Sequence, residues 1–257
     1  MAEKRKMGGE LMTQLIGAIC EKYTSVVLLS DRQTERAGLV LERGPKGTEI
    51  AKNAVTLTAG TAHEPAIVDS VRDKYLSASP VPKMETLIEE LVDRYHDRRL
   101  HKIRNEILRP RGFDSLDEFY AKQRAMHESL VLEMNMDIEK CELGLLILVG
   151  CVDTKGAHLS YIDDPGTECN YDTIAFFCPG MGREQAESTF VMYDYSPDLS
   201  VEDTLRIAYL AKERGRMAGG VGVATDGWII SKEGVNAVPE EKFKELREYW
   251  KGENVLR

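Results

Sequence analysis

The sequence lacks any apolar run long enough to span a membrane. Its longest apolar stretch, Leu143–Val149, is far shorter than the about 20 residues that a membrane-spanning helix requires. The N-terminus also lacks the charged start, apolar middle and small-residue cleavage site of a secretion signal. These absences predict a protein without membrane contact and with a cytoplasmic location.

Cysteine is scarce, and its spacing carries no motif. The chain has five cysteines, an odd number, and no two of them form CxxC. This pattern indicates neither a zinc cluster nor a redox pair. Three of the cysteines lie in or beside apolar runs, so we expect buried, reduced thiols. We predict neither a metal nor another cofactor.

A positive excess is also lacking, because the formal net charge is −9. A nucleic-acid binder needs a basic surface, so this charge argues against nucleic acid as a partner. The one strongly basic stretch, Arg99–Arg111, has two interpretations: a patch for RNA or a protein partner, or a solvated helix face. Acidic residues flank it on both sides and favour the helix face.

What is present is the composition of an ordinary globular chain. Of the 257 residues, 42% are hydrophobic and 30% are charged. This length is enough to bury a sizeable core in one large domain or two small ones. Repeats and low-complexity linkers are absent, which favours a single domain.

The N-terminal half predicts strands followed by helices. Two apolar runs, Leu15–Cys20 and Ser25–Ser30, predict a hairpin of buried strands. Residues 32–49 contain three glycines and a proline, which predict turns or a short irregular strand. A third strand is predicted at Ala54–Thr58, and a helical section from about residue 62 to 137.

The C-terminal half predicts a second alternation of strand and helix blocks. The predicted strands cover Leu143–Val149, Ala157–Ile162, Asp172–Cys178 and Gly219–Ile230. The predicted helices cover 182–193 and 201–217, and a last one begins near Pro239. Ser200 and Asp203 have the spacing of a cap that opens the second of them. The residues Asp163–Gly166 predict a turn. Because strands and helices come in separate blocks, the predicted class is α+β.

A capping-box pattern lies inside the helical section. Ser115 is followed three residues later by Glu118, the spacing in which each side chain binds a free backbone N–H at a helix start. The pattern predicts a helix that runs through residue 135.

Several motifs in the first 60 residues resemble those of proteasome β-subunits and of the related bacterial HslV peptidase. Thr13 precedes Gly17 by four residues, as a threonine precedes a glycine at the start of that family. Val26–Arg32 resembles the family's second strand, which ends in an acidic residue and arginine. Lys46 precedes Gly60 by fourteen residues, as the family's lysine precedes its Ala-Gly turn.

The second half of the chain resembles the same family. Gly156–Asp163 resembles one of its strands, and Ala218–Gly234 resembles its last strands. The resemblance implies an α+β fold built as a four-layer αββα Ntn-hydrolase sandwich over residues 13–257, with a helical insertion at about 96–136. Residues 1–12 would be an N-terminal extension. The resemblance also implies a homo-oligomer.

The resemblance implies a function as well, namely that of an N-terminal-threonine hydrolase acting on a peptide or small amide through an acyl-enzyme. Thr13 matches the family's nucleophile, and Lys46 and Asp31 match its lysine and acidic residue. The backbone N–H of Gly60 matches its oxyanion donor. Two further residues, Thr58 and Ala62, match positions near the family's primary specificity pocket.

Each of these residues also has a simpler structural interpretation. Thr13 leads a predicted strand, Asp31 follows one and is able to cap a turn, and Lys46 lies between glycines and a proline in a predicted loop. Their joint order and spacing favour the catalytic interpretation over three unrelated structural ones.

Three departures from the family pattern leave alternatives open. Met181 lies between two glycines where the family has a serine, and Gly215 and Ala218 stand where it has an aspartate and a serine. Those family residues support the terminal amine and its proton transfers. Their loss indicates an altered proton relay or a catalytically inactive scaffold or assembly subunit. A third alternative is a transpeptidase similar to connectase, in which an amine resolves the acyl-enzyme.

Thr13 is internal in the sequence as written and therefore has no free amine. Translation from Met12 followed by removal of that methionine would expose the amine, because threonine is small enough to permit removal. Self-cleavage between Met12 and Thr13 is the other route. We therefore expect residues 1–11 to be absent from the mature chain.

Overall fold

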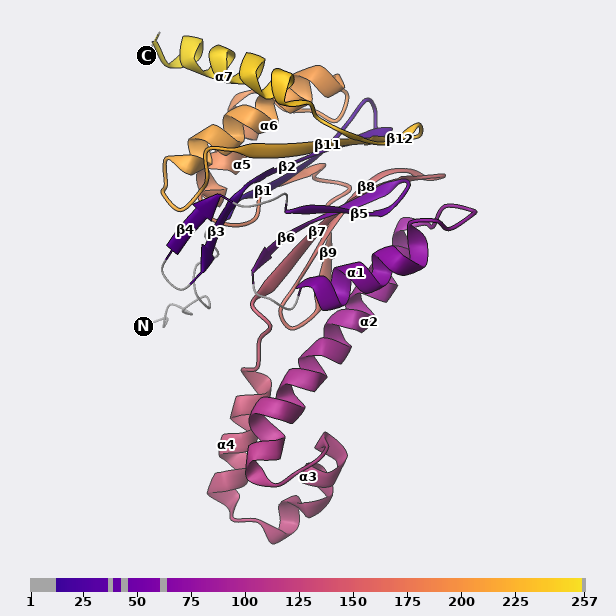
Figure 1. Ribbon diagram of the computed structural model, residues 1–257, viewed down its shortest axis with the longest axis vertical. Coiled ribbons are helices and arrows are strands. Elements are labelled where there is room, and N and C mark those ends of the chain that lie inside the picture. Colours follow the sequence, from indigo (N-terminus) through magenta and orange to yellow (C-terminus); the bar gives the residue numbers. More distant parts are fainter. Residues whose placement is uncertain (1–12, 37–38, 43–45, 61–63, 256–257) are drawn as a thin grey trace.

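The computed structural model describes residues 13–36, 39–42, 46–60 and 64–255. Figure 1 shows two twisted sheets with helices beside them, and a helical arm that projects away from the sheets. The arm runs from the second half of α2 through α4, so the predicted insertion at about 96–136 falls within it.

The first sheet contains the first and the last strand of the described chain, β1 and β12. Its five antiparallel strands are arranged β10-β1-β2-β11-β12. Their bounds are Leu15–Cys20 for β1, Ser25–Asp31 for β2, Phe176–Phe177 for β10, Thr225–Ser231 for β11 and Gly234–Ala237 for β12. Leu15 pairs with Ser30 and Cys20 with Ser25, so the predicted β1–β2 hairpin is confirmed.

The second sheet is formed by the middle of the chain, in the order β5-β6-β7-β8-β9. Its bounds are Gly47–Ala51 for β5, Ala54–Gly60 for β6, Leu145–Asp153 for β7, Gly156–Asp163 for β8 and Thr167–Asn170 for β9. A separate hairpin pairs β3, Gln33–Arg36, with β4, Leu39–Glu42. The predicted strands at Ala54–Thr58, Leu143–Val149 and Ala157–Ile162 are thus confirmed with shifted ends.

Seven α-helices are found in the described residues. They are α1 Glu64–Tyr75, α2 Met84–Ile103, α3 Leu116–Lys122, α4 Glu128–Glu139, α5 Arg183–Met192, α6 Val201–Arg216 and α7 Glu240–Val255. The hydroxyl oxygens of Ser115 and Ser200 accept hydrogen bonds from the N–H groups of Glu118 and Asp203, both at 3.1 Å. These caps start α3 and α6 where the sequence predicts.

Alternating side chains of β1 face two different cores. Leu15 and Ile19 belong to a buried cluster built from both sheets. Ile16 and Ala18 point the other way, into a cluster with α5, α6 and α7. A third cluster joins the second sheet to α1 and the first half of α2. The alternation along β1 therefore decides which of the two clusters each side chain after Thr13 enters.

The arm has a hydrophobic cluster of its own, centred on Ile107, Phe119 and Met134. Part of the basic stretch holds it together, because Arg99 donates to the carbonyl oxygens of Cys141 (2.8 Å) and Ile138 (2.9 Å). Arg111 forms an ion pair with Asp137 at 2.8 Å. These arginines therefore act within the arm, between its outgoing and returning helices.

The prediction of a four-layer αββα Ntn-hydrolase sandwich is wrong. The described residues form an α+β fold with two five-stranded antiparallel sheets, a separate two-stranded sheet and seven α-helices. A four-layer sandwich lays its helices flat on two sheets, whereas α3, α4 and the far half of α2 project as the arm (Figure 1). These helices bury their apolar faces against one another and need no sheet to cover. The class α+β is kept, without the sandwich.

Several predicted elements also have different limits. The helix predicted from Ser115 through residue 135 ends at Lys122, and α4 begins at Glu128. Of the strand predicted at Asp172–Cys178, only Phe176–Phe177 is in a strand, and residues 172–174 form a turn. The strand predicted from Gly219 begins at Thr225, because Gly219 and Gly220 have left-handed φ values of 87° and 74°.

None of the helices in the described part combines the length and the apolar character needed to cross a membrane.

A charged cluster ties β8 to the turn that follows β9. The His158 ring contacts Asp172 Oδ2 through Nδ1 at 2.7 Å and Asp153 Oδ1 through Nε2 at 3.2 Å. The hydrogen bond to Asp172, together with the charges of both carboxylates, raises the pKa of His158. His158 is therefore a protonated bridge over a wider pH range than an isolated histidine.

We expect His158→Gln to destabilise the protein in a pH-dependent way. Because the folded pKa is raised, the contribution of His158 is present below its ordinary pKa of about 6.5 and is lost as the pH rises through the folded pKa. The free energy of unfolding should fall by about 1 to 2 kcal/mol at about pH 5.5 and by much less at about pH 9. Urea unfolding at both pH values measures this, with the exposed His101→Gln as control. An equal loss at both pH values would contradict it.

Candidate functional site

Three of the predicted site residues meet at one point, although they lie at the ends of different strands. Thr13 lies two residues before β1, Asp31 ends β2, and Lys46 directly precedes β5 in the other sheet. The Lys46 ammonium donates a hydrogen bond to Thr13 Oγ1 and another to Asp31 Oδ1, the latter at 2.9 Å. A hydroxyl, a cation and an anion are thus in direct contact.

The Asp31 carboxylate is fully buried and accepts hydrogen bonds from four donors. Oδ1 accepts from the Gln14 N–H (2.9 Å) and from Lys46 Nζ (2.9 Å). Oδ2 accepts from the N–H groups of Gln33 (2.9 Å) and Gly222 (3.0 Å). These four donors, one of them a cation, satisfy both oxygens of the buried carboxylate. Asp31 therefore holds Lys46 in place by charge and geometry together.

The backbone of Lys46 is held by Thr58 of β6. The Lys46 carbonyl oxygen accepts from the Thr58 N–H at 3.0 Å and from Thr58 Oγ1 at 3.3 Å. The side chain of Lys46 is only 11% exposed. Thr58, predicted near a specificity pocket, thus contacts the lysine that faces Thr13. Ala62, the other predicted pocket residue, lies outside the described residues.

Gly60, the predicted oxyanion donor, is the last residue of β6, two positions beyond Thr58. It pairs with Leu145 and has a left-handed φ of 132°. A Cβ at this position would lie 2.0 Å from the carbonyl oxygen of Gly144. Both the conformation and the close backbone approach require glycine here.

The segment that packs against Gly60 is itself anchored. The N–H groups of Leu143 and Gly144 each donate to the Asp164 carboxylate at 2.7 Å. The Tyr95 hydroxyl of α2 donates to the Leu145 carbonyl oxygen at 2.8 Å. Asp164 follows β8 in the predicted turn. Besides reversing the chain, this turn therefore anchors residues 143 and 144.

Two residues of the site escaped sequence reasoning because only the fold brings them near. Gly222, in a segment predicted as strand, donates to Asp31. Lys212 of α6 holds the same segment, since its Nζ donates to the Val223 carbonyl oxygen at 2.8 Å and to Glu213 Oε1 at 3.0 Å. Burial lowers the pKa of Lys212. In the sequence, only the glycines at 219, 220 and 222 marked this segment as unusual.

The segment that contains the departure Met181 lies beside Thr13. The Met181 N–H donates to the Thr13 carbonyl oxygen at 2.8 Å. Gly180, with a φ of 106°, pairs with Gln14. The side-chain amide of Gln14 packs against Gly215, the second departure. Ala218 lies just beyond the end of α6 and is exposed.

Two buried cysteines lie in the first sheet or beside it, and neither is a reactive thiol. A thiol reacts as its thiolate, so a raised pKa makes it inert. Burial raises the pKa of Cys20 to about 12 and that of Cys178 well above its usual value.

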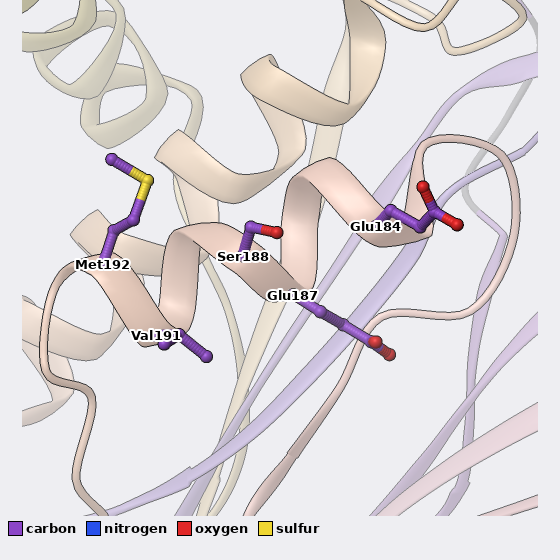
Figure 2. A pocket seen from close by; sticks show the side chains of 5 residues that line it. All are labelled: Glu184, Glu187, Ser188, Val191 and Met192. Carbon is purple, nitrogen blue, oxygen red and sulfur yellow. The ribbon is translucent and has the colours of Figure 1, made fainter.

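A shallow depression lies along the outer face of α5 (Figure 2). It is lined by Glu184, Glu187, Ser188, Val191 and Met192. Ser188 is the only hydroxyl in this lining, and the lining contains neither histidine nor lysine to activate it. The depression therefore lacks the contact of a hydroxyl, a lysine and a buried carboxylate that is found at Thr13.

No protein-family model matches the chain, and no curated protein sequence matches it. The likeness to proteasome β-subunits accordingly stays the resemblance of motifs described above.

We expect Asp31→Asn to lower the free energy of unfolding by about 2 to 4 kcal/mol. The amide would present an NH₂ to at least one of four donors and would leave Lys46 without its anion in a largely buried position. Urea unfolding at neutral pH measures the loss. The matched control is Asp226→Asn, because Asp226 pairs with the partly exposed Arg32, and the expected loss there is below about 1 kcal/mol. Equal losses would contradict the central role of Asp31.

Proposed function

We propose that the protein is an N-terminal-threonine hydrolase that cleaves peptide or other amide bonds through an acyl-enzyme on Thr13. One observation carries the proposal: the Lys46 ammonium contacts both the Thr13 hydroxyl and the buried Asp31 carboxylate. A threonine that only precedes a strand, or a lysine that only lies in a loop, would not require contact with the other two residues of this cluster.

The three residues supply part of what a hydroxyl nucleophile requires. The hydroxyl must lose its proton as it attacks, and the α-amine of Thr13 is the base, once residues 1–12 have been removed. Lys46, held as an ammonium by Asp31, stabilises the negative charge that develops on Thr13 Oγ1. Asp31 keeps the cation in place and does not itself exchange a proton with the substrate.

The steps follow from this division of roles. Thr13 Oγ1 bonds to the amide carbon of the substrate while its proton passes to the α-amine. The tetrahedral oxyanion then expels the amine product, which takes that proton, and an ester remains on Thr13. Water then bonds to the ester carbon and gives a proton to the α-amine, the bond from that carbon to Oγ1 breaks, and the proton passes to Oγ1 as the acid leaves. An amine in place of water would give transpeptidation. The N–H of Gly60 is the proposed donor to the oxyanion.

The proposal leaves other predictions as they were. A homo-oligomer and a cytoplasmic location stay predictions, and so does the identity of the peptide or small amide substrate. The alternative of an inactive scaffold is decided by the experiment that follows.

We expect an epoxyketone to form a stable adduct on Thr13 when that residue is N-terminal. The protein is made with residues 9–12 replaced by a factor Xa recognition sequence, folded at full length and then cleaved before Thr13. Intact-mass and peptide mass spectrometry locate the adduct. The cleaved protein should react, and the uncleaved one should not, because the reagent needs both the hydroxyl and the free amine.

Two variants test the roles within the cluster. Thr13→Ala should give no adduct, and Lys46→Met should slow its formation by about 100-fold or more, since one preorganised charge contributes at least this much to such a step. Lys52→Met is the control, because Lys52 is an exposed lysine at the β5–β6 turn. Absence of both adduct and amide hydrolysis in the cleaved wild type would reject the proposal and favour the scaffold.

A further inference from the structure

Gln14 carries a buried polar atom that the proposed reaction does not yet use. Its side chain is fully buried, and its Nε2 donates to the Gly182 carbonyl oxygen at a long 3.5 Å. Its Oε1 has no hydrogen-bond partner among the described residues. A buried acceptor without a partner is costly, so such an atom calls for an explanation.

Two glycines make the room that this amide occupies. A Cβ on Gly215 would lie 2.3 Å from both Nε2 and Oε1 of Gln14. A Cβ on Gly182 would lie 2.3 Å from the Gly215 carbonyl oxygen. Any larger residue at 215 would therefore displace the amide. The Gln14 side chain stands in the space that a side chain from α6 would otherwise fill.

The backbone holds this amide one residue away from the nucleophile. The Gln14 N–H donates to Asp31 Oδ1 at 2.9 Å, on one side of the chain. On the other side, the Met181 N–H donates to the Thr13 carbonyl oxygen at 2.8 Å. The backbone of residues 13 and 14 is thus fixed on both edges, and the buried side chain of Gln14 is confined beside Gly215 and Gly182.

We propose that Gln14 positions the α-amine of Thr13, with Oε1 accepting a hydrogen bond from it once Thr13 is N-terminal. While Thr13 is internal, its nitrogen belongs to a peptide bond and has one hydrogen. The released amine has two, and three after it takes the proton from Thr13 Oγ1. Oε1 accepts one of these N–H groups and orients the amine, and the proton still passes to the leaving amine of the substrate. The inference rests on the proposed function of Thr13.

The charged groups of the site stay the same when Gln14 is changed. They are Asp31 and Lys46, and the buried pair Lys212–Glu213, which holds the segment that binds Asp31. A change in the pKa of the amine between Gln14 variants therefore reports the side chain at position 14.

The test measures the pKa of the Thr13 α-amine in the factor Xa-cleaved protein. Competitive labelling with acetic anhydride over a pH series, followed by mass spectrometry of the N-terminal peptide, gives this pKa without any need for activity. Gln14→Leu should lower it by about 0.5 to 1 pKa unit, because an acceptor for the ammonium is lost. Gln14→Glu should raise it, because a carboxylate favours the ammonium. The pH profile of kcat should shift in the same two directions.

Thr204→Val is the matched control. Thr204 Oγ1 is another buried polar atom, on the same side of the first sheet but in the first turn of α6, at the opposite end of that helix from Gly215. Its removal should leave the α-amine pKa unchanged. In the uncleaved protein, Gln14→Leu should keep or raise the melting temperature, since it removes an unsatisfied acceptor; this checks that the variant folds.

The outcomes separate this inference from the proposed function. If the α-amine pKa is the same in wild type, Gln14→Leu and Gln14→Glu, Gln14 only fills space and the inference is wrong, even when Thr13 reacts with the epoxyketone. If the pKa shifts in opposite directions but Thr13 neither forms the adduct nor cleaves an amide, Gln14 holds the amine and the hydrolase proposal fails.

Discussion

The site depends on a single buried carboxylate. Asp31 accepts hydrogen bonds from Gln14, Gln33, Gly222 and Lys46, so it joins the start of β1, the end of β2, the segment after α6 and the start of β5. A carboxylate out of contact with water is stable only when its oxygens are satisfied. This demand for hydrogen-bond donors therefore draws four segments of the chain to one point and places the Lys46 ammonium against Thr13.

Two glycines near that point have neighbours so close that a Cβ atom would not fit. Gly60 lies against Gly144, and Gly215 lies against the amide of Gln14. Glycine serves a different purpose at each place. Gly60 needs both a left-handed conformation and room for a neighbouring carbonyl, whereas Gly215 leaves space for a side chain from another element.

The arm reaches the neighbourhood of the site through one short segment. The chain returns from α4 through residues 141–144, where Asp164 binds two N–H groups, and enters β7 opposite Gly60. Tyr95 of α2 binds the Leu145 carbonyl oxygen in the same place. Both helices that lead into and out of the arm are thus tied to the strand end beside Gly60, while the rest of the arm is held by its own core.

Local pattern alone determined much of the secondary structure, including the β1–β2 hairpin, the caps at Ser115 and Ser200 and the turn at Asp163–Gly166, because these depend on neighbours within a few residues. The resemblance of motifs to proteasome β-subunits also singled out Thr13, Asp31 and Lys46, which the fold brings into contact. The four-layer sandwich was wrong because no local signal says whether an amphipathic helix packs on a sheet or on another helix, as the arm does. The tertiary structure alone decided the parts of Gln14, Gly222 and Lys212, since their partners lie far away in sequence and a buried polar group takes whichever partners the packing brings within reach.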